Sequence, residues 1–190
     1  PDMRLPKLRE ALAEGSSCSA RAALKSKAKS AAAVLCDLAA DPEQRGFVLA
    51  EGVVPHLAAL LRNGGPHGRH FAAGALGYLA EAADVARQVA AASSDLADLA
   101  VVALLDKVRE AKETWVAKAN AARLLASLAQ VPELRERVAR AGGVPHLVAL
   151  LRRALASAGE DRCGAEVLAA RALSSLAASP GLCASIVDAG

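Results

Sequence analysis

The sequence predicts an all-α, right-handed solenoid built from repeated units of three helices, and three observations lead to this prediction. A stretch that begins at Gly52 returns almost unchanged at Gly142, 90 residues later. The apolar residues follow the spacing of helices and lack the alternation of strands. The composition is 54% apolar but only 2% aromatic. The apolar residues are therefore largely Ala, Leu and Val, which suit closely packed helices.

The duplicated stretch predicts a turn followed by a helix. It reads Gly-x-Val-Pro-His-Leu-x-Ala-Leu-Leu-Arg at both places. Glycine just past a helix accepts the left-handed conformation that ends it. Proline near the first position of a helix lacks only a donor that would be unpaired there anyway. A short helix therefore ends before Gly52 and Gly142, and a second helix begins at Pro55 and Pro145. A solenoid repeats such a start because each unit packs on a copy of itself.

A second motif, Ala-x-x-Leu-x-x-Leu-Ala, predicts a longer third helix in each unit. Its spacing places the four residues on one helical face, which we expect to be buried. The motif occurs four times, as Ala32-Leu35-Leu38-Ala39, Ala73-Leu76-Leu79-Ala80, Ala122-Leu125-Leu128-Ala129 and Ala170-Leu173-Leu176-Ala177.

These two motifs, with three helices in about 40 to 47 residues, resemble armadillo repeats over essentially the whole chain. We expect a single domain over 1–190. In the first repeat the second helix begins at Leu5 and the third spans about 22–40. In the third repeat Ser93-Ser94-Asp95 replaces the Gly-Pro turn as the cap before Leu96. The predicted repeats span about 5–40, 41–83, 84–130 and 131–179, with a partial fifth at 180–190. Because no polar cap closes the C-terminal end of the repeats, we expect the chain to be a fragment of a longer array.

The resemblance to armadillo repeats implies that a partner lies along the third helices, which line a concave groove in that family. Counting from the motif alanine, positions −2, +1 and +5 lie opposite the buried face. Armadillo nuclear-import receptors carry Trp at +1 and Asn at +5, and this ladder is absent here. Arg123 and Arg171 occupy +1 in neighbouring repeats, and arginine pairs well with carboxylates and phosphates. The candidate groove residues are Asp37, Phe71, Tyr78, Asn120, Arg123, Ser127, Arg171 and Ser175.

No arrangement of catalytic residues stands out, and we predict neither an enzyme nor a cofactor. His56 and His146 lie two repeats apart, too far to share a metal ion. His67 and His70 supply only two ligands, so we predict no metal site. Cys36 takes a position where the other repeats have small residues, which indicates a buried, unreactive thiol. Cys18 and Cys163 fall in two long loops, 15–19 and 156–164, where we expect surface insertions.

The charge and hydropathy patterns narrow the classes of partner. The net charge is +3, and residues 1–29 hold seven basic and three acidic side chains. Lys25, Lys27 and Lys29 could attract nucleic acid, but the rest of the chain is slightly acidic and poor in aromatic residues, so we expect no such partner. No apolar run approaches the roughly 20 residues of a membrane span. The four cysteines indicate a reducing compartment, and we expect the cytoplasm, with the nucleus as a second location.

The sequence therefore favours a monomeric, non-catalytic scaffold that binds a protein or peptide. The preferred ligand is an extended acidic or phosphorylated segment, as in catenin-like armadillo proteins. Two alternatives stay open. One is the substrate-recruiting repeat region of a U-box-type ubiquitin ligase, whose enzyme domain would lie outside this chain. The other is a vacuolar-type adaptor at a membrane surface, which would need an acylation site near the true N-terminus.

Overall fold

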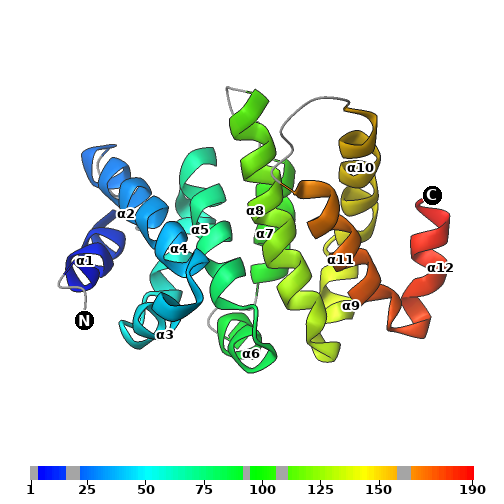
Figure 1. The fold of residues 1–190 in the computed structure, drawn as a ribbon, viewed down its shortest axis with the longest axis horizontal. Coiled ribbons are helices and arrows are strands. Elements are labelled where there is room, and N and C mark those ends of the chain that lie inside the picture. The colour runs from blue at the N-terminus through cyan, green and yellow to red at the C-terminus, as the bar shows by residue number, and fades with distance from the viewer. Residues whose placement is uncertain (1–3, 16–21, 92–94, 106–110, 158–163) are drawn as a thin grey trace.

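The computed structural model describes residues 4–15, 22–91, 95–105, 111–157 and 164–190. This part of the chain forms helices that follow one another in a row, with the two termini at opposite ends (Figure 1). The helices are α1 (Leu5–Gly15), α2 (Ala22–Ala40), α3 (Pro42–Ala50), α4 (Val54–Asn63), α5 (Pro66–Leu79), α6 (Ala83–Ala91), α7 (Leu96–Leu105), α8 (Ala111–Gln130), α9 (Pro132–Arg140), α10 (Gly143–Ala156), α11 (Ala165–Ala177) and α12 (Pro180–Asp188).

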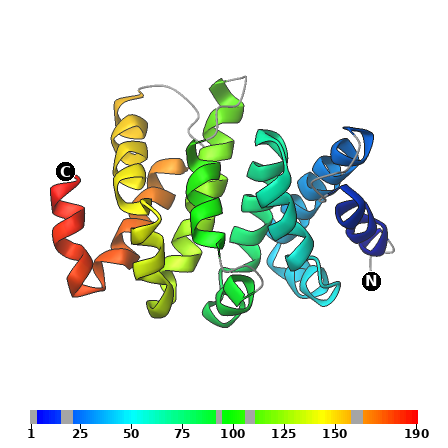
Figure 2. The same cartoon turned by 180° about the vertical axis from the view of Figure 1, so that it is seen from behind.

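The helices form two stacked ladders. The long third helices α2, α5, α8 and α11 pack side by side and are seen from the front in Figure 1. The second helices α1, α4, α7 and α10 form a ladder behind them, and Figure 2 shows that side of the molecule. The short helices α3, α6 and α9 connect one repeat to the next. The prediction of an all-α solenoid with three helices per repeat is confirmed, including the second helix that starts at Leu5 and the third helix over 22–40.

The repeated glycine adopts the left-handed conformation expected of it. The φ angle is +65° at Gly52 and +85° at Gly142. The backbone N–H of each glycine donates to the carbonyl of Leu49 or Ala139 in the short helix it follows. Helix α4 starts at Val54, one residue before the proline, and α10 starts at Gly143, two residues before it. The sequence motif thus marks the turn more accurately than the first helical residue, because helix ends depend on local hydrogen bonding.

Replacing Gly52 with Ala should destabilise the protein by about 1 to 2 kcal/mol, because an L-residue is strained at positive φ. A Cβ at Gly52 would meet no atom within 4 Å, so the cost would come from the backbone alone. Gly46→Ala is the matched control. Gly46 lies inside α3, also with open space around it, and alanine should stabilise that helix by about 0.5 to 1 kcal/mol. Urea unfolding followed by circular dichroism measures both. Equal effects of the two substitutions would contradict the assignment of the turn.

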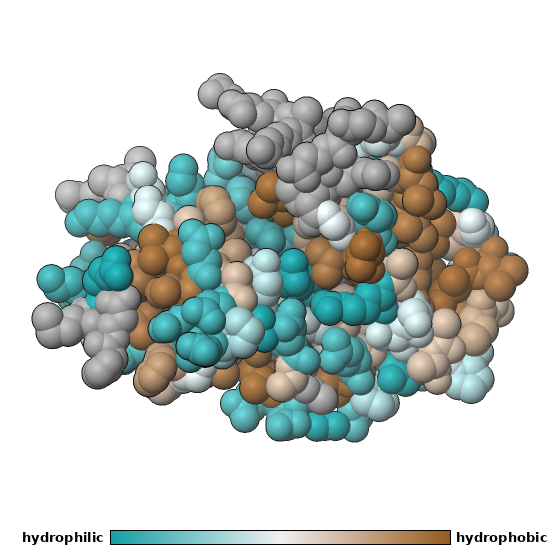
Figure 3. All heavy atoms as spheres, viewed as in Figure 1, coloured by the Kyte–Doolittle hydropathy of each residue, from teal (hydrophilic) through white to brown (hydrophobic). Residues whose placement is uncertain are grey.

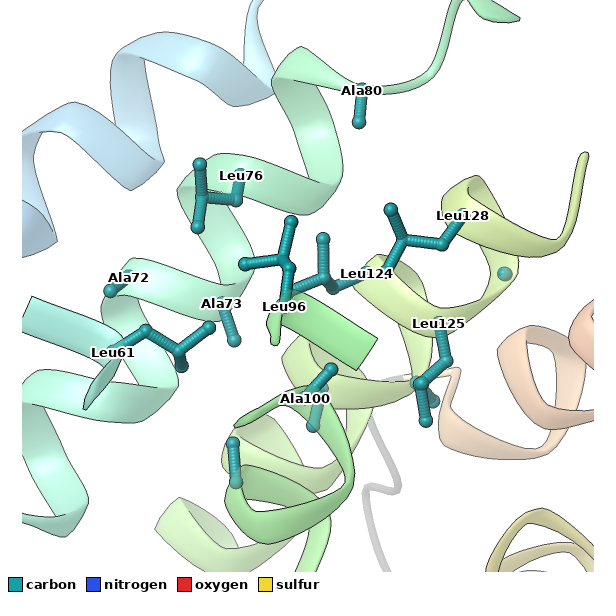
Figure 4. Close-up of a cluster of buried hydrophobic side chains, with 14 of the residues drawn as sticks. Leu61, Ala72, Ala73, Leu76, Ala80, Leu96, Ala100, Leu124, Leu125 and Leu128 are labelled. Atoms are coloured by element: carbon teal, nitrogen blue, oxygen red, sulfur yellow. The ribbon is translucent and has the colours of Figure 1, made fainter. Parts of the chain in front are cut away.

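The core lies between the two ladders and is made of small and medium side chains. Figure 4 shows Leu61 of α4, Leu76 of α5, Leu96 of α7 and Leu125 of α8 converging on one cluster. Each of these leucines is 0 to 2% exposed. Alanines such as Ala73 on α5 fill the spaces between them, which lets neighbouring helices approach closely. The predicted buried face of α5 and α8 is confirmed at every motif position.

The predicted buried face is wrong at two positions of α11. Leu173 and Leu176 are buried, but Ala170 and Ala177 are exposed. Helix α8 lies between α5 and α11, so its motif alanines are covered on both sides. Within the described part of the chain, α11 has α8 on one side and only the short α12 beyond it. The two alanines therefore remain open to solvent.

Two arginines join successive repeats in a way that the motifs did not reveal. The Nε atom of Arg45 on α3 donates to the carbonyl of Ala39, 2.7 Å away. Arg135 on α9 makes the same bond to Ala129, at 2.9 Å. Both carbonyls lie in the last turn of a third helix, where cations are favoured by the helix dipole. The 90-residue offset between the arginines equals that of the duplicated turn, and this equality is the signal that could have found them.

Candidate functional site

The third-helix face carries a hollow that crosses α2, α5 and α8. Its volume is about 510 Å³, within the usual range of ligand pockets. It is lined by Lys29, Ser30 and Ala33 of α2, by His67, His70 and Phe71 of α5, and by Val116 of α8. A second hollow of about 360 Å³ shares Lys29 and His67 with the first and extends toward Gly64–Gly68. Figure 3 shows this face of the molecule, where hydrophilic atoms are interspersed with hydrophobic ones.

The prediction that all the candidate groove residues are exposed is wrong for Asn120 and Ser127. Ser127 is fully buried, and its hydroxyl donates to the carbonyl of Gly77, 3.0 Å away. Asn120 is 7% exposed, and its Nδ2 donates to the carbonyl of His70 at 3.2 Å. Both residues therefore join α8 to α5. Because α5 approaches α8 closely at Gly77, positions that a single helix would turn outward are covered by its neighbour.

Arg123 lies in an ionic cluster at the C-terminal end of α5. Its guanidinium stacks 3.9 Å from the ring centre of Tyr78, and its Nη1 lies 3.6 Å from Oε1 of Glu81. The other carboxylate oxygen of Glu81 binds Nη1 of Arg45 at 2.7 Å. The Arg123 side chain is only 17% exposed. Its cation–π contact and ion pair hold the side chain against the protein, so Arg123 is less available to a ligand than the sequence suggested.

Arg171 occupies the equivalent position on α11 but has different surroundings. The residue is partly exposed, yet its Nε and Nη2 atoms are covered by protein and have no hydrogen-bond partner in the described structure. In Arg123 only Nε is in that situation. Ser175, one turn further along α11, donates its hydroxyl to the carbonyl of Arg171 at 3.0 Å. Asp37 is exposed on α2, and Phe71 and Tyr78 are half-buried on α5.

The thiol of Cys36 is buried, as predicted. The side chain is 7% exposed. Burial, and to a smaller extent the negative charge of Asp37, raise the pKa of the Cys36 thiol to about 12, although the positive charge of Arg123 opposes the shift. The thiol therefore stays protonated at neutral pH, and a protonated thiol is a poor nucleophile. Cys18 and Cys163 lie outside the described residues, whereas Cys183 is exposed on α12.

The histidines take separate positions. His146 on α10 lies 2.6 Å from the carbonyl of Gly142 through Nδ1, next to the turn. His70 is 3% exposed, and its ring packs against those of Phe71 and His67. In the described residues, no three His, Cys, Asp or Glu side chains lie together as metal ligands.

The two predicted loops fall mostly on 16–21 and 158–163, outside the described residues, as do Ser93 and Ser94. The Asp95 carboxylate binds Arg62 through both oxygens.

Several solved structures have a similar fold. No family model matches the chain, and no curated protein does. A crystal structure of an engineered protein superposes on 98% of the chain and 68% of its own length, with a TM-score of 0.71 and 27% identity. A designed armadillo repeat protein covers 98% and 70%, with a TM-score of 0.72 and 20% identity. A second design, solved in complex with the peptide (KR)4, covers the same shares with a TM-score of 0.69 and 20% identity.

The two ladders of helices and these likenesses together define an all-α repeat solenoid. More narrowly, the chain has an armadillo-like repeat fold, which confirms the resemblance seen in the motifs. Among the helices of the described part, none is both long enough and apolar enough to cross a membrane.

Proposed function

We propose that this chain is a non-catalytic scaffold that binds an extended acidic or phosphorylated protein segment along its third helices. The observation that carries the proposal is the hollow of about 510 Å³ shared by α2, α5 and α8. It lies on the same helices that hold the sequence-predicted groove, and one ligand there would contact three repeats at once. The armadillo-like fold supports this reading, since one designed neighbour of that fold binds a peptide.

The lysines that line the two hollows favour an acidic ligand. Lys29 lines both hollows, Lys25 lines one of them, and Arg171 lies further along the same ladder of helices. The designed neighbour binds a basic peptide, and the cations here would repel such a ligand. Charge-assisted hydrogen bonds to carboxylates or phosphates are stronger than neutral ones. The groove should therefore select against basic segments as well as for acidic ones.

An acidic peptide should bind this chain at least about tenfold more tightly than a basic peptide of equal length at low salt, because charge complementarity favours it. Fluorescence anisotropy with labelled eight-residue peptides of Glu and Ser, phosphoserine and Ser, and alternating Lys and Arg measures this. Salt should weaken the acidic complexes, since screening reduces exposed charge pairs.

A pair of charge-reversed variants tests the location of the groove. Lys29→Glu should lower the affinity for the acidic peptides about three- to tenfold. Lys27→Glu makes the same charge change on the same helix, at an exposed residue that lines neither hollow, and should change affinity less than about twofold. Equal losses in both variants, or tighter binding of the basic peptide, would contradict the proposal.

A further inference from the structure

Two nitrogen atoms of Arg171, Nε and Nη2, are covered by protein and have no hydrogen-bond partner in the described residues. In the repeat before it, Arg123 rests on Tyr78 and faces Glu81. At the two corresponding positions, α8 carries Ser127 and Gln130. Ser127 is buried and already bonded to Gly77, and an amide replaces the carboxylate. Arg171 therefore has neither the aromatic ring nor the carboxylate that its equivalent has.

This difference agrees with the two covered nitrogen atoms of Arg171, Nε and Nη2, which have no acceptor in the described structure. Covering charged N–H groups without an acceptor costs about 1 to 3 kcal/mol or more. A carboxylate or phosphate that drew out the guanidinium of Arg171 would remove this cost and form a charge-assisted bond. The site on α11 thus favours an anionic side chain of a ligand.

The hollow across α2, α5 and α8 can take an apolar side chain of the ligand. It is lined by the partly exposed side chains of Ala33, Phe71 and Val116, together with the polar residues Lys29, Ser30, His67 and His70. The volume of about 510 Å³ has room for a large side chain together with its backbone. The three apolar side chains offer contact to an apolar group of a ligand, and Lys29 adds positive charge.

We propose that the ligand is an extended segment with two anchors, an apolar side chain in the hollow and an anionic side chain at Arg171. The inference rests on the proposed function and adds the spacing of the anchors. The hollow is centred on α5, and α11 lies two third-helices further along. Neighbouring packed helices are ~8–10 Å apart, so the anchors are separated by ~16–20 Å. An extended chain covers ~3.3–3.6 Å per residue, which places the two side chains about five or six residues apart.

A series of labelled peptides tests the spacing with the intact chain. Each peptide carries one Phe and one Glu in a neutral Gly and Ser background, two, four, six or eight positions apart and in both orders. Anisotropy should show the tightest binding near a spacing of six in one of the two orders, at least about fivefold tighter than at a spacing of two. Changing Phe to Ala or Glu to Gln in the best peptide should each remove most of this gain.

Two protein variants test the anion site. Arg171→Ala should weaken binding of the best Glu-containing peptide about fivefold or more. It should leave binding of the same peptide with Gln in place of Glu unchanged. Gln130→Glu supplies the missing carboxylate from within the protein, and should weaken binding of the Glu-containing peptide by competing for Arg171. The controls are Arg140→Ala on α9 and Gln88→Glu on α6. They make the same charge changes at exposed residues of the short helices, away from the ladder of third helices. Phosphoserine in place of Glu distinguishes the anions, since tighter binding assigns the site to phosphate and weaker or equal binding to carboxylate.

The outcomes separate this inference from the proposed function. Suppose that acidic peptides bind more tightly than neutral ones, but that affinity does not depend on the spacing and that Arg171→Ala and Arg140→Ala have equal effects. This result would overturn the two-anchor ligand and would leave the proposed scaffold function intact. If acidic peptides bind no better than neutral ones, both proposals fail.

Discussion

Replacing Leu125 with Ala is expected to destabilise the protein by about 2 to 5 kcal/mol, the usual range when a buried leucine is truncated. Leu125 is fully buried on α8, in the cluster shown in Figure 4. Helix α8 packs against α5, α7 and α11, so a cavity there weakens the contacts of two neighbouring repeats at once. In a solenoid, stability is roughly a sum of repeat and interface terms, and this substitution removes a part of several of them.

Urea unfolding measured by tryptophan fluorescence checks this prediction. Trp115 is the only tryptophan of the chain, and it lies buried on α8 itself. Val102→Ala on α7 is the control, because that valine is 45% exposed and its truncation should cost less than about 0.5 kcal/mol. A Leu125→Ala variant that unfolds at the same urea concentration as the parent would show that α8 is not central to the core.

Replacing Gly77 with Ala is expected to destabilise the protein by about 1 to 3 kcal/mol, although alanine is the better helix former. A Cβ at Gly77 would lie 2.9 Å from the backbone nitrogen of Leu124 and 3.0 Å from Cγ of Arg123. Backbone atoms of α8 cannot move aside alone, so α5 and α8 would separate. That separation would also stretch the hydrogen bond from Ser127 to Gly77.

Gly68→Ala provides the matched control, since it makes the same change on the same helix. The nearest atom to a Cβ there is a flexible end of the Leu60 side chain, at 3.4 Å. We expect Gly68→Ala to be neutral or to stabilise the helix by up to about 1 kcal/mol. Thermal unfolding of the two variants gives the comparison. Stabilisation by Gly77→Ala would mean that the two third helices lie further apart than the structure has them.

The repeated motifs predicted the architecture because they encode local events. A glycine that adopts positive φ and a proline that starts a helix mark the turns at 52–55 and 142–145, wherever the rest of the chain lies. The spacing of Ala and Leu likewise marks the buried face of α5 and α8 from within each helix. Even the irregular third repeat has its second helix start at Leu96, as predicted. The extent of the whole array and the division into repeats remain predictions.

The candidate site was less predictable, because exposure on one helix depends on the helix beside it. Counting around a single helix placed Asn120 and Ser127 outward, but α5 covers both and receives their hydrogen bonds. The same counting could not distinguish Arg123 from Arg171. Their difference depends on what the preceding helix carries, and an alignment of the repeats shows it once the partners of Arg123 are known.

The sequence by itself determined that this chain is a stack of three-helix repeats without the tryptophan ladder of nuclear-import receptors, since turn residues and helical spacing act over a few positions. The tertiary structure alone decided where the hollow lies, which candidate residues remain open, and that Arg123 is held by Tyr78 and Glu81 whereas two nitrogen atoms of Arg171 have no partner in the described residues. The physical reason is that these features arise between helices roughly 40 to 50 residues apart in the chain. Their relative placement is set by the close packing of Gly77, Ser127 and their neighbours.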